Sequence, residues 1–196
     1  EEKIDKEIQT VLRTKDVLDK KGFKHYLAKE INEQSEVVLS LLQGLLPSSE
    51  KPVQLDYLNL TPKILKEADR ILILACGTAY HAGLVGKYVI ENLTSIPVEV
   101  QFASEYLNSA SLLTNKSLII GISQSGETAD TIAAIKKAIN CGAKLIGITN
   151  QSDSALADLA NNHWVISKSG VEVSVAATKT FTTQMLVIYL LAIYFA

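Results

Sequence analysis

Hydroxyl side chains gather at one junction of the sequence, "SLIIGISQSGETADTI" (117–132), where an apolar run passes into a helical pattern. Ser123, Ser125 and Thr128 supply three hydroxyl groups there. The first turn of a helix leaves backbone N–H groups unpaired and carries a partial positive charge, so an anion can bind without a basic side chain. Gly126 would let the backbone approach a ligand closely. The corner therefore suits a phosphate group.

The residues at this corner argue against two common classes of phosphate ligand. It has neither the lysine of a Walker P-loop nor the glycine spacing of a dinucleotide fingerprint, which disfavours ATP and NAD. A phosphate monoester on a small molecule fits better. The alternative is that the hydroxyls only cap a helix, which is the usual role of Ser and Thr at that position. Taken alone, the motif leaves both interpretations open.

Two further segments resemble this corner. The sequence "ACGTAYHAG" (75–83) repeats the order of strand, small residue, hydroxyl and helix, and the two corners could face one cleft. The sequence "GVEVSVAATKTFTTQ" (170–184) has small residues before a Thr-rich helix start, so its backbone could also approach a ligand. On pattern alone, a loop and an N-cap before a core helix is the favoured interpretation of this third segment.

The elements that must position these corners alternate between strand and helix from residue 70 onward. Strands are predicted at 70–76, 97–103, 116–123, 143–150 and 163–169, and helices near 79–93, 128–141 and 154–160 and from 178 onward. Several strands are apolar on both faces, as in a parallel sheet covered by helices. The predicted fold is an α/β three-layer αβα sandwich with a doubly wound sheet, which binds ligands at the carboxyl ends of its strands.

A region of different pattern precedes this alternation. Apolar residues at helical spacing over 1–45 predict two helices divided by Gly22, and 44–60 reads as a connecting segment. Thr61 looks like an N-cap with Pro62 at the first helical position. We therefore expect N-terminal helices and a connection over 1–60 and the sandwich domain over 61–196.

Composition excludes several classes of function. The net charge of −2, without a dense Lys/Arg run, argues against a nucleic-acid partner. The charged N-terminus has no secretory signal, and the final apolar run of about a dozen residues is too short to cross a bilayer, so we expect a buried helix and no membrane partner. Cys76 and Cys141 read as buried free thiols, in keeping with a reducing cytoplasm. The three histidines (His25, His81 and His163) are too scattered to predict a metal site.

The segments "LACGTAYHAG", "SQSGETADT" and "EVSVAATKTFTTQ", in this order and spacing, resemble the sugar isomerase (SIS) domain family. With "KHYLAKEINEQ" (24–34) upstream, they are most similar to the first SIS half of the synthase domain in the glutamine:fructose-6-phosphate amidotransferase family. The resemblance covers about residues 20–196. It implies a five-stranded parallel sheet of the flavodoxin-like type, and a protein that uses ammonia from glutamine to convert fructose 6-phosphate to glucosamine 6-phosphate, with no cofactor.

The resemblance also implies site residues. Those that hold the sugar phosphate are Ser123, Gln124, Ser125 and Thr128; those beside the sugar are Gly77, Thr78, Val175 and Ala176. The family commonly has Ser at the positions of Ala79 and Ala177, so a hydroxyl contact is expected to be lost or replaced at each. Binding should survive, because the phosphate anchor would be the 123–128 corner.

The resemblance further implies an excised fragment. The family's glutaminase domain, with its N-terminal cysteine nucleophile, and the Glu, Lys and His that isomerise the sugar lie outside the matching segments, so the fragment alone is expected to be inactive. Glu127 could act as a base, but a carboxylate in a helix first turn is the favoured role. Lys179 reads as a solvated side chain, with a phosphate or interface contact as the alternative.

Two other functions compete with this interpretation. One is a stand-alone SIS phosphosugar isomerase whose site is completed by a dimer partner. The other is the sugar-phosphate-sensing module of a transcription regulator, although the N-terminal region lacks the basic character of a DNA reader. Because SIS domains pair, we also expect exposed apolar surface to drive formation of a homodimer.

Overall fold

A computed structural model describes residues 19–46, 48, 52–58, 60–109, 112–161 and 163–196. Within these residues, five parallel strands form one sheet in the order β2-β1-β3-β4-β5. The strands are β1 (Ile71–Ala75), β2 (Val98–Phe102), β3 (Leu118–Ile122), β4 (Lys144–Thr149) and β5 (Trp164–Ile166). The predicted sandwich with a flavodoxin-like parallel sheet is thereby confirmed.

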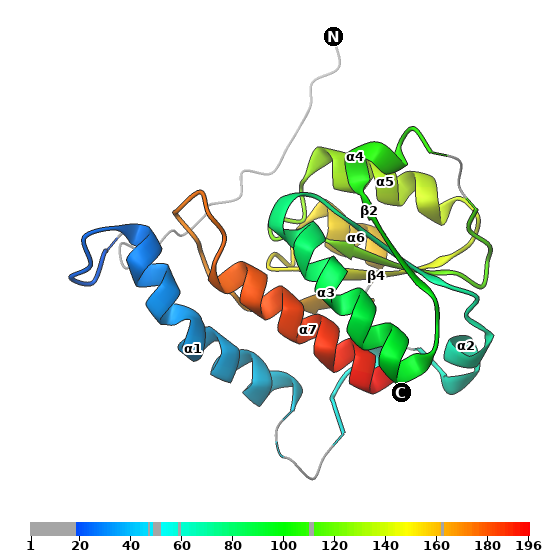
Figure 1. Ribbon diagram of the computed structural model, residues 1–196, viewed down its shortest axis with the longest axis horizontal. Helices are drawn as coiled ribbons and strands as arrows, with labels where there is room; N and C mark the ends of the chain where they lie inside the picture. The colour runs from blue at the N-terminus through cyan, green and yellow to red at the C-terminus, as the bar shows by residue number, and fades with distance from the viewer. Residues whose placement is uncertain (1–18, 47, 49–51, 59, 110–111, 162) are drawn as a thin grey trace, which may run out of the picture.

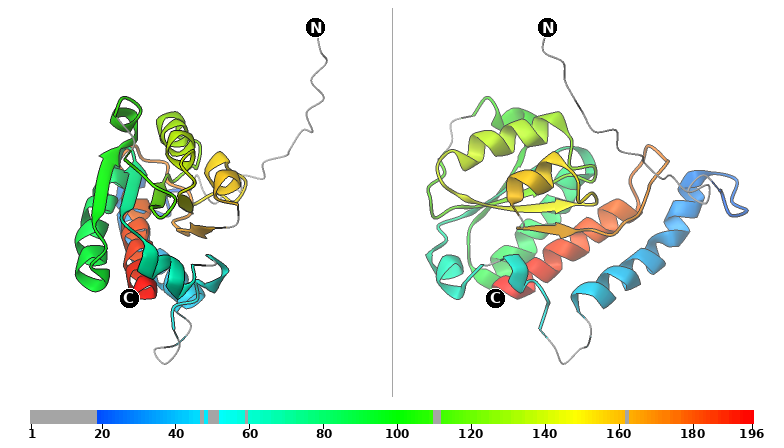
Figure 2. Two further views of the ribbon diagram at one scale, coloured as in Figure 1. Left: turned by 90° about the vertical axis from the view of Figure 1, so that its right-hand side faces the viewer. Right: turned by 180° about the vertical axis from the view of Figure 1, so that it is seen from behind.

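The sheet separates two apolar cores because successive strand residues point to opposite faces. On one face, Ile71 and Ile73 of β1 pack in a core with residues of α3 (Gly77–Thr94) and α7 (Lys179–Phe195). On the other, Leu72 and Leu74 pack with α4 (Ala103–Tyr106), α5 (Ala129–Ile139) and α6 (Ala155–Ala160). Figure 2 shows these helix layers on the two sides of the sheet.

The central strands β1 and β3 are buried along their whole length, which explains their uninterrupted apolar sequences. Their register sets Ala75 opposite Ile122, the last residue of each strand. The two chains therefore leave the sheet at the same level. This is the edge at which the two predicted hydroxyl-bearing corners begin.

The helix α7 is a core element, as its apolar sequence predicts. It lies between α3 and α1 (Tyr26–Leu45), and the three helices run side by side in Figure 1. A methyl group at Gly86 of α3 would collide with Ile188 of α7, so glycine permits this close approach. Among the described residues, we find no helix with the length and apolar character that a membrane span requires.

Local signals at the start of the domain are also confirmed. Thr61 caps α2 (Pro62–Glu67), because its hydroxyl accepts a hydrogen bond from the Ile64 N–H, and Pro62 is the first helical residue. The helix predicted before Gly22 lies largely outside the described residues, whereas the second one is α1.

Two boundaries differ from the prediction, and two short helices were not predicted. Helix α3 begins at Gly77 rather than near 79, so the hydroxyl corner lies in its first turn. The short helices α4 and η2 (Asp56–Leu58) carry no sustained apolar period and were not predicted. Strand β5 ends at Ile166, short of the predicted 169, because the backbone soon turns through positive φ at Lys168 and Gly170.

Candidate functional site

A pocket of about 250 Å³ opens where β1 and β3 end. All three predicted loops contribute to it. It is lined by Cys76, Thr78, Ala79, Ile122, Ser123, Gln124, Ser125, Thr128, Glu172, Ser174, Val175, Ala177, Thr180 and Gln184. Of the predicted site residues, Gly77 and Ala176 lie next to lining residues in the chain but are not part of the lining themselves.

The 123–128 corner is organised by its own hydroxyls. Ser123 is 3% exposed, and its Oγ accepts a hydrogen bond from the Gly126 N–H at 3.1 Å. The same Oγ lies 2.9 Å from the Thr128 Oγ1. Whichever of these hydroxyls donates to the other, the proton of the accepting hydroxyl remains available for a ligand.

The outer part of the corner also presents donors. The Ser125 Oγ accepts from the Glu127 N–H at 3.1 Å, which leaves the Ser125 hydroxyl proton free to donate. In the described part of the chain, the N–H groups of Gln124 and Ser125 make no hydrogen bond. Thr128 is the N-cap of α5 but its hydroxyl makes no capping bond within the described structure. Simple capping of α5 therefore does not account for these hydroxyls.

Gly126 has a packing role that was not predicted. Its φ is +69°, a region that favours glycine, and a methyl group there would collide with the Ser154 side chain at the start of α6. Glycine is thus required for packing between the corner and α6.

Glu127 likewise differs from the prediction. It lies before the N-cap of α5, and its Oε1 accepts a hydrogen bond from the Ala155 N–H at 2.7 Å. The carboxylate therefore satisfies the first turn of α6 rather than that of α5. Since Glu127 is outside the pocket lining, a role as a base in this pocket is not supported.

The first corner places Thr78 and Ala79 in the opening turn of α3. Gly77 is exposed and adopts φ +59°, which allows the sharp exit from β1. Cys76, predicted to be buried, is only partly so; it is a free thiol that lines the pocket and accepts a hydrogen bond from the Thr131 hydroxyl at 3.7 Å. Cys141 is also free and partly exposed.

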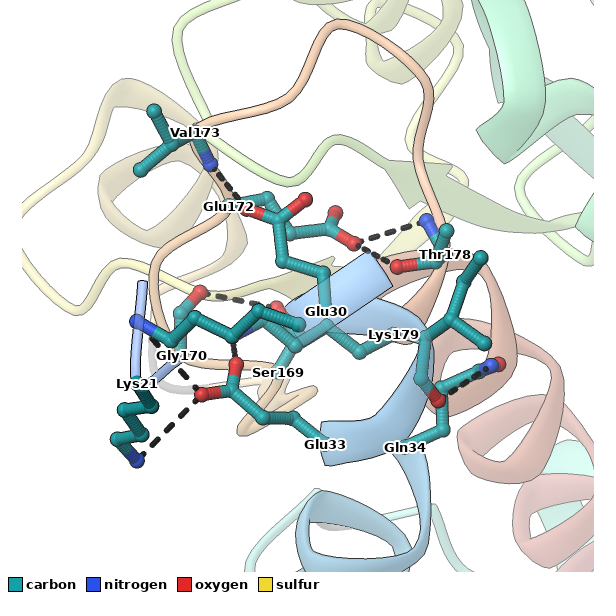
Figure 3. A network of polar contacts seen from close by, with 12 residues as sticks. Lys21, Glu30, Glu33, Gln34, Ser169, Gly170, Glu172, Val173, Thr178 and Lys179 are labelled. Atoms are coloured by element: carbon teal, nitrogen blue, oxygen red, sulfur yellow. Dashed lines mark hydrogen bonds and ion pairs between the residues drawn. The ribbon is translucent and has the colours of Figure 1, made fainter. Parts of the chain in front are cut away.

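The third loop, residues 170–178, is held from outside by a buried carboxylate of α1. Glu30 is 2% exposed, and its Oε1 accepts from the N–H groups of Val173 at 2.5 Å and of Ser174 at 3.3 Å. The Ser174 hydroxyl donates to the Glu30 Oε2. Figure 3 shows Glu30 reaching from α1 to the loop. Ser174 and its neighbour Val175 both line the pocket.

Two further contacts fix the junction of this loop with α7. Within the loop, the Glu172 Oε1 accepts from the N–H of Thr178 at 2.8 Å and from its hydroxyl at 2.9 Å. The Lys179 Nζ donates to the Glu33 Oε2 at 2.7 Å (Figure 3). Lys179 is 5% exposed, so the prediction of a solvated side chain was wrong. Ala177, two residues before Lys179 in the chain, lines the pocket, as does Ala79.

The carboxyl group of Glu33 is kept ionised by this arrangement. Burial opposes its charge, but the hydrogen bond and charge of Lys179, with the charges of Lys29 and Lys21, hold the pKa of Glu33 below its ordinary value. Glu33 therefore remains ionised at neutral pH, and its contact with Lys179 joins α1 to the start of α7.

The hydrogen-bond donors that line the pocket are neutral groups. Among the described residues that line the pocket there is no Lys, Arg or His, and Glu172 is the acidic one. An anion is therefore best accommodated at the 123–128 corner, where hydroxyl and N–H donors converge. Among the described residues, no group of three or more His, Cys, Asp and Glu could hold a metal ion.

Glu30 and Glu33 build the site but were not predicted from the sequence pattern. Both lie in "KHYLAKEINEQ", a segment singled out by its resemblance but given no role. Their partners are more than 140 residues away in the chain, so no local spacing could reveal them. Gln184 was also missed, although it ends the third quoted segment and lines the pocket.

Replacement of Glu30 by Ala should release the third loop. Hydrogen bonds to a charged acceptor contribute about 1.5–3 kcal/mol, so the Val173 and Ser174 amides should exchange roughly tenfold to a hundredfold faster. Hydrogen-exchange NMR measures this directly, with β3 amides as the internal reference. Glu36→Ala, on the exposed side of α1, is the matched control and should change neither amide. Unchanged protection in Glu30→Ala would contradict the role given to this carboxylate.

Comparison with known proteins gives consistent results. The chain is 41% identical over 195 residues to a glutamine–fructose-6-phosphate aminotransferase [isomerizing] of Clostridium acetobutylicum, covering 100% of this chain and 32% of that protein. It is 43% identical over 180 residues to the enzyme of that name from Gloeobacter violaceus, covering 92% of this chain and 29% of the relative. The chain thus spans about a third of the length of these curated relatives.

Solved structures and a family model support the same relationship. The C-terminal domain of glucosamine-fructose-6-phosphate aminotransferase from Francisella tularensis superposes with a TM-score of 0.79 at 35% identity, over 89% of this chain and 48% of that one. The model of the SIS domain matches residues 64–194, most of the chain. The protein therefore belongs to the SIS domain family.

Proposed function

We propose that the pocket binds fructose 6-phosphate and its product glucosamine 6-phosphate, and that this chain is the substrate-binding half of the isomerase domain of a glucosamine-6-phosphate synthase. The observation that carries the proposal is the convergence of three loops, with hydroxyl and N–H donors, in one pocket that has no cationic lining residue in the described structure. The names of the relatives point to the same substrate.

In this proposal, each part of the pocket meets a different part of the ligand. The phosphate is held by Ser123, Gln124, Ser125 and Thr128, where the available protons and N–H groups lie. The sugar extends toward Gly77 and Thr78 on one side and toward Val175 and Ala176 on the other. Glu172 is a poor neighbour for a phosphate, so it belongs at the sugar end, where a carboxylate can accept from hydroxyl groups.

The isomerisation reaction requires acid–base groups that the described pocket lining does not supply. Isomerisation needs an acid and a base within hydrogen-bond reach of C1 and C2 of the sugar. The titratable lining residues among those described are Cys76 and Glu172, and the Glu172 carboxylate is already bonded to Thr178. We therefore propose that this chain anchors the substrate, while a second SIS unit and a glutaminase domain of the same protein supply the acid–base groups and the ammonia.

The organisation of the chain follows from the same proposal. We assign residues 61–196 to the SIS domain and 1–60 to the segment that leads into it; the cap at Thr61 and the family match from residue 64 support this division. The alternatives of a stand-alone isomerase and of a sensing module in a transcription regulator gain no support, because the relatives named above are aminotransferases. A cytoplasmic location, without a cofactor and without a nucleic-acid partner, completes the proposal.

Replacement of Ser125 by Ala tests the phosphate assignment. The substitution removes a hydroxyl that would donate to a charged phosphate oxygen, a bond worth about 1.5–3 kcal/mol, so affinity should fall roughly tenfold to a hundredfold. Isothermal calorimetry with fructose 6-phosphate and with glucosamine 6-phosphate measures the loss. Ser125 is preferable to the buried Ser123, because the Ser123 Oγ bonds both the Gly126 N–H and the Thr128 hydroxyl, whereas the Ser125 Oγ bonds the Glu127 N–H alone among the described residues.

The matched control is Ser35→Ala on the exposed face of α1, which should bind as the unmodified chain does. Equal affinity of Ser125→Ala and the unmodified chain for both sugar phosphates would show that the phosphate lies elsewhere.

We also propose that the chain forms a homodimer through the helical face that carries α1, α3 and α7. Large apolar side chains are exposed on each of these helices, among them Leu39 (59%), Tyr88 (67%) and Ile193 (55%). Light scattering after size exclusion, at tens of micromolar, should give twice the mass of the 196-residue chain, and Ile193→Glu should shift it toward the monomer. A monomeric mass for the unmodified chain at that concentration would refute the proposal.

A further inference from the structure

Gln184 presents a buried side-chain amide that has no protein partner in the described structure. The residue lies in the second turn of α7 and is 1% exposed. Its Oε1 and Nε2 atoms are both buried, and neither makes a hydrogen bond with any described residue. The side chain nevertheless lines the pocket between β1 and β3. An amide in this position is unusual, because buried polar groups almost always have partners.

The neighbouring polar groups of α7 do have partners, so the unpaired amide is not a general feature of this helix. The Thr180 hydroxyl, one turn earlier on the same face, donates to the Ser169 Oγ at 3.1 Å. The Thr183 hydroxyl donates to the Lys179 carbonyl at 3.0 Å. Gln184 is therefore the residue on this stretch whose buried amide has no partner among the described residues.

The chemistry of the amide indicates which ligand group fits. A primary amide offers two N–H donors and a carbonyl acceptor. A phosphate dianion can only accept hydrogen bonds, so it would leave Oε1 unpaired. A sugar hydroxyl both donates and accepts, so a pair of neighbouring hydroxyls can satisfy Oε1 and Nε2 together. The phosphate is already accounted for by the hydroxyls of the 123–128 corner.

We propose that Gln184 is a specificity-determining residue whose amide binds a hydroxyl group of the hexose, which rests on the proposed function of the pocket. Because the amide has no partner within the described protein, it is satisfied only when a ligand hydroxyl bonds to it. A site built to bond a hydroxyl discriminates against an analogue that lacks it, since the analogue leaves the buried amide unpaired. Gln184 thus distinguishes hydroxylated sugar phosphates from deoxygenated ones and from phosphate alone.

The test is Gln184→Met, which keeps the length of the side chain but removes both polar atoms. Calorimetric titration of the unmodified chain and the variant uses fructose 6-phosphate and, separately, inorganic phosphate. A neutral hydrogen bond corresponds to about a threefold to tenfold change in affinity. The variant should bind fructose 6-phosphate weaker by that factor and inorganic phosphate unchanged. An equal loss for both ligands, or no loss for either, would overturn the inference.

The melting temperature provides a second readout, because a purely structural role of the amide would make the Gln184→Met variant melt lower than the unmodified chain. Because no described residue pairs with the amide, Gln184→Met should melt no lower than the unmodified chain. A clearly lowered melting temperature would assign the amide to a structural partner such as a buried water, and would overturn the proposal.

A series of deoxy sugar phosphates tests the proposal on the unmodified chain as well as on the variant. Glucose 6-phosphate is compared with its 2-deoxy, 3-deoxy and 4-deoxy analogues. One deletion should weaken binding to the unmodified chain, and the same deletion should have no effect in Gln184→Met. Equal losses in both proteins would refute a contact with Gln184. If the unmodified chain bound no hexose phosphate at all, both the proposed function and this inference would fail. If hexose phosphates bound equally well to the unmodified chain and to Gln184→Met, only the inference would be overturned.

Discussion

The side-by-side ending of β1 and β3 is the constraint on which the rest of the site depends. These strands pair in register up to Ala75 and Ile122, so the residues that follow them emerge at one level. Helix α3 then packs on one face of the sheet and α5 on the other. The two connections diverge at the point where the strand order reverses, and this opens a crevice at the carboxyl ends. The pocket is therefore a consequence of topology before any side chain is considered.

The side chains that line the crevice then determine which ligand it can bind. Its floor is provided by hydroxyls and backbone N–H groups, without a cationic side chain among the described lining residues. Ser123 and Thr128 are bonded to each other, which fixes their orientation before a ligand arrives. A neutral, preorganised set of donors suits a ligand that must bind and then leave, because it avoids a strong fixed ion pair.

The third loop completes the pocket only because α1 supports it. The Glu30 carboxylate binds the loop backbone, and the ion pair of Glu33 with Lys179 fixes the start of α7. Figure 3 shows these contacts between α1 and the loop. The segment before the SIS domain is thus part of the site's support. A domain cut at residue 61 would remove both Glu30 and Glu33, so the loop amides and Lys179 would lose these partners.

Features that depend on neighbours in the chain could be predicted from the sequence. The apolar strands, the cap at Thr61 and the corner hydroxyls are of this kind, and they gave the fold class and the three loops of the pocket. The roles of Gly126, Glu127 and Lys179 could not be predicted in this way. Each depends on a partner from another element, namely Ser154, Ala155 and Glu33. Long-range packing, rather than local pattern, decided these roles.

The central claim is that a hexose phosphate binds at the crevice between β1 and β3. Amide NMR during titration with fructose 6-phosphate tests it most directly, because it reports the position of the ligand residue by residue. We expect saturable shifts concentrated at 123–128, with smaller ones at Thr78 and Val175. Shifts concentrated instead at the amino ends of the strands, around the pocket lined by Thr94, Pro97 and Phe195, would contradict it.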